Sequence, residues 1–181
     1  DRADASHLRT ASPVRFDTAP HAAQVVRLPL QTLYTEPLCL APAPAARKRE
    51  ATVPEIEAAR AASGDTIKPG GTGMIHMGIH NDLYGSPAYV HDFPGLSVEA
   101  VHWLAVHKIT MFGVEAVSPA PEGEPNYLAH LACAERGITH MECLMNLDKL
   151  VGKGRFRFAG FPLKIKGGTA SPIRAVAIFE D

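Results

Sequence analysis

Seven consecutive residues, 76–82, carry three side chains that could bind one metal ion. The stretch reads HMGIHND, with His76 and His80 four residues apart and Asp82 two residues further on. Neutral imidazoles together with a carboxylate suit zinc, manganese or iron. Gly78 lets the backbone turn tightly, so that both rings can face one point. The alternative is a solvated loop with incidental histidines, in a chain that contains nine of them.

Two further pairs of residues have the types that metal sites use. His130 lies in a predicted helix over residues 126–136, and Glu142 follows a glycine and a short strand. A helix followed by a returning strand can bring such a pair together, although an exposed histidine and a surface glutamate are the commoner case. Asp17 and His21 are also four residues apart and could share a metal ion. The residues alone predict an α/β domain and leave metal binding open.

The composition limits the classes of protein to which the chain can belong. The chain has 181 residues, 46% of them hydrophobic and 20% charged, which predicts one domain over residues 1–181. A formal net charge of −1 gives no reason to expect nucleic acid or an anionic membrane as a partner. The apolar runs are shorter than the roughly 18 residues of a membrane span. Three cysteines without a compact framework favour free thiols in a reducing, cytoplasmic compartment.

The N-terminal half is weakly patterned. Residues 1–50 are rich in Ala, Pro and Arg, and the apolar stretch 25–33 contains Pro29, which favours an edge strand or an extended connection. Thr52 begins a capping-box pattern that predicts a short helix ending at Gly64. Residues 65–95 are rich in glycine and proline and are expected to be mainly loop.

The C-terminal half alternates between helix and strand patterns. Ser97 and Asn126 are predicted to cap two helices, and Gly137 is expected to end the second. The remaining elements are predicted helices over 98–107 and 126–136, and predicted strands at 109–114, 138–141, 156–165 with a bulge, and 173–179. Because helices and strands interleave, the fold class is α/β.

Four stretches carry a resemblance to a known family. They are the Gly64-Asp65 and Thr72-Gly73 pairs, FPGLS at 93–97, His130 with Glu142 twelve residues later, and the closing segments NLDKL, FPLKI and GTASPIRAV at 146–150, 161–165 and 168–176. These stretches resemble the cyclase family of metal-dependent hydrolases, whose best-known members are the bacterial kynurenine formamidases. The resemblance covers residues 64–181 well and residues 12–63 faintly.

The resemblance implies a fold and an activity. It implies a single compact cyclase-like domain with a mixed β-sheet flanked by helices, and a homodimer or higher homo-oligomer. It also implies one or two divalent ions, zinc or manganese, and hydrolysis of an amide, formamide or lactone carbonyl in a small-molecule substrate.

The early metal motif of the family, H-x-G-T-H-x-D-x-P-x-H, is degenerate in this chain. Counted back from the late histidine, it falls near residues 11–21, where Asp17 and His21 match but Ala11 and Arg15 replace the two leading histidines. The stretch 76–82 matches the first half of the motif far later in the chain. It is either a relocated set of ligands or a set of incidental histidines.

Two functions follow from the resemblance. In the first, the protein is an arylformamidase-like hydrolase in which His21 transfers protons and Glu142 is both catalytic and a ligand. The other implied ligands are His76, His80, Asp82, His130 and Asp17, and the implied substrate-binding residues are Tyr84, Phe93 and Trp103. In the second, the fold has lost its metal site and serves in binding or assembly.

Overall fold

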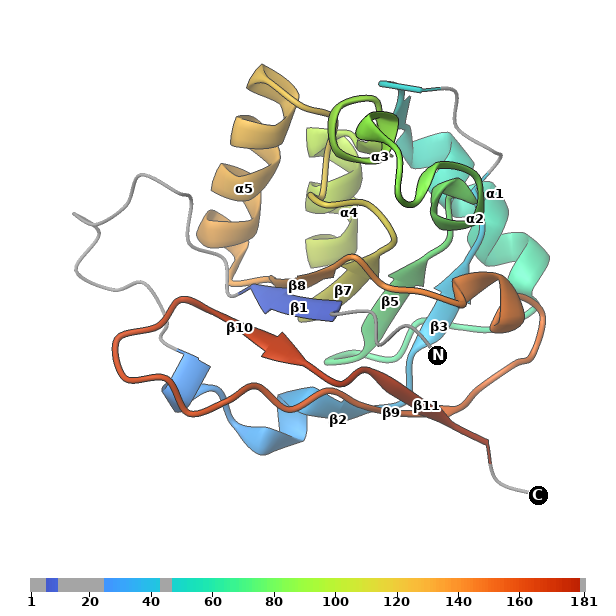
Figure 1. Ribbon diagram of the computed structural model, residues 1–181. Coiled ribbons are helices and arrows are strands. Elements are labelled where there is room, and N and C mark those ends of the chain that lie inside the picture. Colours follow the sequence, from blue (N-terminus) through green and yellow to red (C-terminus); the bar gives the residue numbers. More distant parts are fainter. Residues whose placement is uncertain (1–5, 10–24, 43–46, 180–181) are drawn as a thin grey trace.

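The computed structural model describes residues 6–9, 25–42 and 47–179 of the chain. Its centre is a six-stranded sheet in the order β10-β1-β8-β7-β5-β3 (Figure 1). Its strands are β1 (Ser6–Arg9), β3 (Leu38–Leu40), β5 (Thr72–Ile75), β7 (Met111–Val114), β8 (Thr139–Glu142) and β10 (Ala170–Ile173). The strands β3, β5, β7 and β8 run parallel to one another, whereas β1 is antiparallel to both of its neighbours. The predicted α/β class with a mixed sheet is therefore confirmed.

Helices cover one face of this sheet (Figure 1). They are α1 (Val53–Ser63), α2 (Ile79–Leu83), α3 (Pro87–His91), α4 (Val98–Val106) and α5 (Glu124–Arg136). Ile56 on α1 and Leu104 on α4 are completely buried in the core on this side, together with Phe112 of β7. None of the helices in the described ranges is both long and apolar enough to cross a membrane.

A smaller sheet lies on the opposite face (Figure 1). It has the order β11-β9-β2, from β2 (Tyr34–Thr35), β9 (Arg157–Ala159) and β11 (Val176–Ile178). Between the two sheets lies a second core that contains Met111, Met141 and Phe158. Because successive strand residues point to opposite faces, Met111 joins this core while Phe112 joins the core under the helices. The remaining elements are β4 (Glu50–Ala51), β6 (Gly95–Leu96), and the 3-10 helices η1 (Val25–Arg27), η2 (Leu30–Leu33) and η3 (Leu147–Lys149).

Several local predictions are confirmed. Thr52 and Glu55 form the expected capping box at the start of α1. Gly64 and Gly137 end α1 and α5 in the left-handed conformation that glycine adopts without strain. The hydroxyl of Ser97 caps α4 by accepting a hydrogen bond from the backbone amide of Ala100.

Other local predictions are wrong. The stretch 25–33 forms η1 and η2 instead of the predicted edge strand or extended connection, and Pro29 precedes η2 in extended geometry. Residues 65–95 hold β5, α2 and α3, because a four-residue buried strand can form in a sequence that is locally rich in glycine. The helix predicted to start at Asn126 begins instead at Glu124, directly after Gly123. Of the predicted strand 156–165, only β9 is formed.

Candidate metal centre

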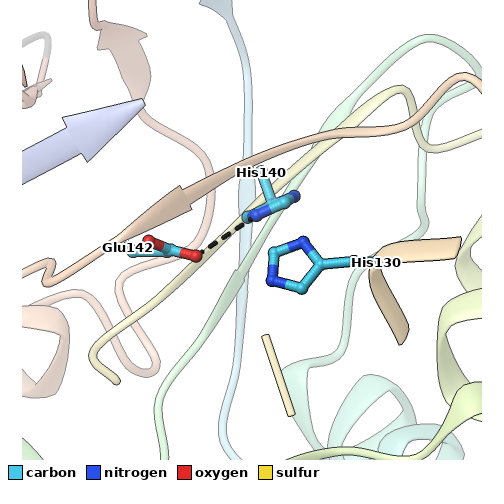
Figure 2. Close-up of side chains that lie close together, drawn as sticks. All are labelled: His130, His140 and Glu142. Carbon is cyan, nitrogen blue, oxygen red and sulfur yellow. Dashed lines mark ion pairs between the residues drawn. The ribbon is translucent and has the colours of Figure 1, made fainter. Parts of the chain in front are cut away.

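Two strand residues and one helix residue form a buried cluster of metal-ligand types. His130 comes from α5, and His140 and Glu142 come from β8. Each residue offers one ligand atom, and these atoms all lie within 4.8 Å of one another. Figure 2 shows the His130 ring and the Glu142 carboxylate on either side of His140. Because His140 and Glu142 are two residues apart on a strand, they face the same side of the sheet, the side that α5 covers.

His140 is the most enclosed member of the cluster. Its side chain is completely buried, and its ring lies 5.7 Å from the ring of Phe112 and 5.0 Å from that of His130, measured between centroids. Its Nε2 atom lies 3.3 Å from Oε1 of Glu142, an ion-pair distance without hydrogen-bond geometry. Neither ring nitrogen has a hydrogen-bond partner in the described part of the chain.

A buried imidazole without hydrogen bonds is costly. A buried polar atom that loses its hydrogen bond to water costs about 1–3 kcal/mol. A divalent cation bound by one ring nitrogen and the neighbouring carboxylate would satisfy this nitrogen and balance the carboxylate charge. Two imidazoles and a carboxylate are also the ligand types that zinc and manganese accept. The residues present therefore fit a divalent metal ion.

The ring of His130 is oriented by a neighbouring hydroxyl. Ser118 Oγ donates a hydrogen bond of 2.7 Å to Oδ1 of Asn126 and lies 3.2 Å from Nε2 of His130. Since the serine hydrogen points to Asn126, its oxygen accepts the hydrogen bond from His130 Nε2–H. This fixes the tautomer of His130 and makes Nδ1 the unprotonated nitrogen, which is the form that ligates metals. Asn126, predicted to be a helix cap, thus contributes to the orientation of a candidate ligand.

The sequence analysis identified His130 and Glu142 but missed His140. His140 lies two residues before Glu142, but the predicted strand ended at residue 141, and only the observed β8 (Thr139–Glu142) places both residues on one strand. The backbone of β1 runs beside these residues, with His7 as the register partner of Glu142 and Arg9 as that of His140.

The first histidine of the stretch 76–82 is held by a buried glutamate. Nδ1 of His76 lies 3.1 Å from Oε1 of Glu115, and the other carboxylate oxygen accepts hydrogen bonds from the backbone amides of Met77 and Gly78 at 2.8 and 2.7 Å. The hydrogen bond that His76 donates to Glu115 raises the pKa of His76. Burial acts in the opposite direction, and the charges of Glu115 and Asp148 raise the pKa further.

The second histidine of this stretch points into an aromatic cluster. The ring of His80 stacks on Tyr84 at 4.6 Å and meets the edge of Tyr89 at 5.8 Å, and Asp82 is exposed. His76 precedes α2 whereas His80 lies within it, so the two rings do not share a helix face. Within the described ranges, the structure does not gather His76, His80 and Asp82 into one group of ligands. A ligand role for them stays a prediction that this geometry does not support.

The other candidate residues have different surroundings. Tyr84 is half exposed, and its ring stacks on that of His80. Phe93 and Trp103 are buried in the core under the helices, and the Trp103 indole donates a hydrogen bond of 3.1 Å to Glu57. Asp17 and His21 lie outside the described residues.

Cys133 lies on α5 three residues after His130, but its environment is unfavourable for a thiolate. Burial raises the pKa of Cys133 to about 12, and the charge of Glu142 acts in the same direction. Cys133 is completely buried in the core under the helices, and the cluster of candidate ligands in the described residues does not include it.

The fold and the cluster together define an α/β protein with a candidate divalent-metal centre. The chain belongs to the cyclase family, because residues 7–121 match the family model described as "Putative cyclase". The resemblance to this family read from the sequence is thereby confirmed.

The chain is also similar to two curated proteins and to a solved structure. It is 36% identical to a kynurenine formamidase of Salinibacter ruber over 78 residues, which are 43% of this chain and 36% of the relative. It is 37% identical to an isatin hydrolase of Roseibium aggregatum over 89 residues, which are 47% of this chain and 34% of the relative. The chain thus aligns with about a third of each of these proteins. A solved isatin hydrolase bound to the product analogue thioisatinate shares the fold with a TM-score of 0.82 at 24% identity, over 97% of this chain and 71% of that one.

Proposed function

We propose that this protein is a metal-dependent hydrolase of a small amide, formamide or lactone. The observation that carries the proposal is the buried cluster of His130, His140 and Glu142, whose ligand atoms lie within 4.8 Å of one another. The substrate class is supported by the curated relatives, which are a kynurenine formamidase and an isatin hydrolase.

The residues of the cluster have distinct tasks in this proposal. His130 and His140 supply neutral nitrogen ligands, and Glu142 supplies the negative charge. Ser118 holds His130 in the tautomer that can ligate. The ring of Phe112 lies on one side of the His140 ring, with 5.7 Å between their centroids. A divalent ion bound there lowers the pKa of a water molecule and polarises the substrate carbonyl.

The candidates for proton transfer are residues that the family resemblance implies. His21, predicted as the general base, lies outside the described residues, and Glu142 is the buried carboxylate nearest to the candidate metal position. Tyr84, half exposed and stacked on His80, is available to contact a planar substrate.

A non-catalytic role is the second candidate, and one observation favours it. Ala11 and Arg15 stand where the family has its two leading histidines, and the similar stretch 76–82 does not form a ligand group in the described structure. A three-residue cluster could then be the remnant of a larger metal site in a protein that serves in binding.

Metal analysis separates the two candidates. The purified chain is passed through gel filtration in metal-free buffer and its zinc and manganese are measured by mass spectrometry. We expect about one ion per chain in the wild type, none in His130→Ala or His140→Ala, and an unchanged amount in His91→Ala, a histidine that is 62% exposed and lies away from the cluster.

Activity is then measured on N-formylkynurenine and isatin by absorbance, before and after chelation. Hydrolysis that is lost with chelator and restored by zinc or manganese supports the enzyme. The proposal is contradicted if the wild type holds no metal and either does not hydrolyse these substrates or hydrolyses them as well as His130→Ala does. That result favours the binding protein.

A further inference from the structure

A cavity of about 280 Å³ opens at one end of the small sheet. Three of its lining residues mark this end: Glu36 directly follows β2, Arg157 is the first residue of β9, and Phe179 directly follows β11. Small-molecule sites are concave, are few per protein and usually have volumes of roughly 300–1,000 Å³. The volume of this cavity therefore suits a small ligand of one or two rings.

The cavity and the candidate metal centre lie in different layers of the protein. His140 and Glu142 face the side of the large sheet that α5 covers. Figure 1 shows the small sheet on the opposite side of the large sheet. In the described part of the chain, the cavity and the cluster have no residue in common. A ligand bound in the cavity is therefore separate from the proposed hydrolysis.

Positive charge dominates the wall of the cavity. Lys153, Arg155 and Arg157 line it with three positive charges, and Glu36 adds one negative charge. Lys68 forms an ion pair with Glu36, and this hydrogen bond and its charge lower the pKa of the Glu36 carboxyl. The one carboxylate is thus already neutralised by a lysine, and the cavity attracts anions.

Two of the three cations are held by their neighbours. Arg155 donates a hydrogen bond to the carboxylate of Asp65. The guanidinium of Arg157 lies 3.7 Å from the carboxylate of Glu36 and 6.0 Å from the centre of the Tyr34 ring. Both arginine side chains are also partly exposed, so they can contact a ligand. Because these side chains are already ordered, less conformational entropy is lost when an anion binds.

Lys153 supplies the third cation. Its backbone amide donates a hydrogen bond of 3.2 Å to the carbonyl of Leu150, in the turn that precedes β9. Its side chain is exposed, and it has no ion-pair partner among the described residues. The ammonium group is therefore available to a bound anion.

The rest of the wall is apolar, from Phe156, Ile178 and Phe179. The ring of Phe179 is 49% exposed and lies 5.5 Å from that of Phe156, measured between centroids. Aromatic rings pair with other rings in stacked or edge-to-face arrangements. The cavity thus combines a cationic wall with an exposed ring.

We propose that this cavity binds a small aromatic carboxylate. The carboxylate contacts Lys153 and Arg157, and the ring of the ligand lies against Phe179. The planar guanidinium suits the two oxygens of a carboxylate, and such charge-assisted hydrogen bonds are stronger than neutral ones. A neutral aromatic amide offers the same ring without the charge, and inorganic phosphate offers an anion without the ring.

An NMR titration tests the proposal with these three kinds of ligand. The ¹⁵N-labelled protein is freed of metal with chelator, and indole-3-acetate, indole-3-acetamide or inorganic phosphate is added. We expect indole-3-acetate to shift the backbone amides of residues 153–157 and 178–179, with a dissociation constant of roughly 1 mM or lower. The amide and phosphate should each bind at least tenfold more weakly. Because salt screens the charges, added sodium chloride should weaken the binding of the acid.

Variants identify the residues that bind the carboxylate. Lys153→Gln and Arg157→Gln should each raise the dissociation constant of indole-3-acetate at least fivefold. Lys166→Gln is the matched control, because Lys166 is also an exposed lysine but does not line the cavity. Circular dichroism and the unfolding temperature show whether each variant is folded, and the exposed Lys153 can be replaced without disturbing the core.

Several results would overturn the proposal. They are an absence of shifts at 153–157 and 178–179, equal affinity in the wild type and in Lys153→Gln, and binding of the amide or of phosphate as tight as that of the acid. The titration is repeated on His130→Ala, which should bind indole-3-acetate as the wild type does. Because neither metal content nor hydrolysis enters the measurement, its outcome is independent of the proposed function.

Discussion

Nδ1 of His76 lies 3.1 Å from Oε1 of Glu115, at the ends of two neighbouring parallel strands. His76 follows the last residue of β5, Glu115 follows the last residue of β7, and the register pairs Ile75 with Val114 just before them. Glu115 is 1% exposed, and its carboxylate also accepts hydrogen bonds from the backbone amides of Met77 and Gly78. The contact therefore holds the chain entering α2 against the carboxyl edge of the sheet.

The contact between His76 and Glu115 predicts a pH-dependent contribution to stability. The hydrogen bond to Glu115 raises the pKa of His76 above its ordinary value near 6.5. A histidine whose pKa is raised in the folded state contributes its full stabilisation at pH values below its ordinary pKa. This contribution is lost as the pH rises through the pKa of the folded state. The difference in unfolding free energy between the wild type and His76→Gln should therefore be larger at about pH 5.5 than at about pH 9, by roughly 1 kcal/mol.

Urea unfolding across this pH range measures the effect. His91→Gln is the control, because His91 is 62% exposed and its contact with Glu122 lies at the surface. Parallel stability curves for the wild type and His76→Gln would show that the contact does not stabilise the fold.

Metal binding at the candidate centre should stabilise the folded chain. A ligand at a hundred times its dissociation constant adds about 2.7 kcal/mol, which for a chain of this size raises the unfolding temperature by roughly 5–10 °C. We expect this rise when zinc or manganese is added to the chelated wild type, measured by scanning calorimetry. In His140→Gln, which keeps a side chain of similar size, the rise should be absent. An equal rise in that variant would place the ion elsewhere.

Gly95 is predicted to be intolerant of any side chain. A Cβ atom at this position would lie 2.3 Å from Cα and 2.6 Å from the carbonyl carbon of Ala120, which are backbone atoms that cannot rotate away. The backbone amide of Leu96 also donates a hydrogen bond to the carbonyl of Pro119, so the two segments are in direct contact at this point. Gly95→Ala should therefore destabilise the protein by about 2–4 kcal/mol in urea unfolding.

Gly85→Ala provides the comparison for Gly95→Ala. Gly85 has φ +83° but open space around its Cβ position, so its replacement should cost only about 1 kcal/mol of backbone strain. A loss in Gly95→Ala no larger than that in Gly85→Ala would show that the backbone around Ala120 can move to make room for the side chain.

The elements with strong local signals were predicted well. Thr52, Ser97 and Gly137 act through hydrogen bonds and backbone conformations within a few residues, so the sequence around each of them is sufficient. The strand β5 and the helices α2 and α3 were missed because their segment is rich in glycine and proline. β5 forms there because it lies between β3 and β7, where long-range pairing outweighs weak local propensity.

The candidate site also contains residues that the sequence predicted and one that it did not. His130 and Glu142 were identified from their types, their spacing and a family resemblance, and the structure brings them together. His140 was not identified, because nothing in its immediate sequence shows that its ring faces α5. Its position follows from the pairing of β8 with β7, which sets His140 opposite Phe112.

By itself, the sequence determined the α/β class, the caps of α1 and α4, the family and two residues of the cluster. These features depend on local hydrogen bonding, on the periodicity of apolar residues and on motifs readable along the chain. Only the tertiary structure showed that His140 of β8 lies with His130 and Glu142, and that His76 and His80 are not part of this cluster. Residues close in sequence separate when a helix begins between them, as happens at Ile79, whereas His130 and His140 meet because a helix packs across the strand that follows it.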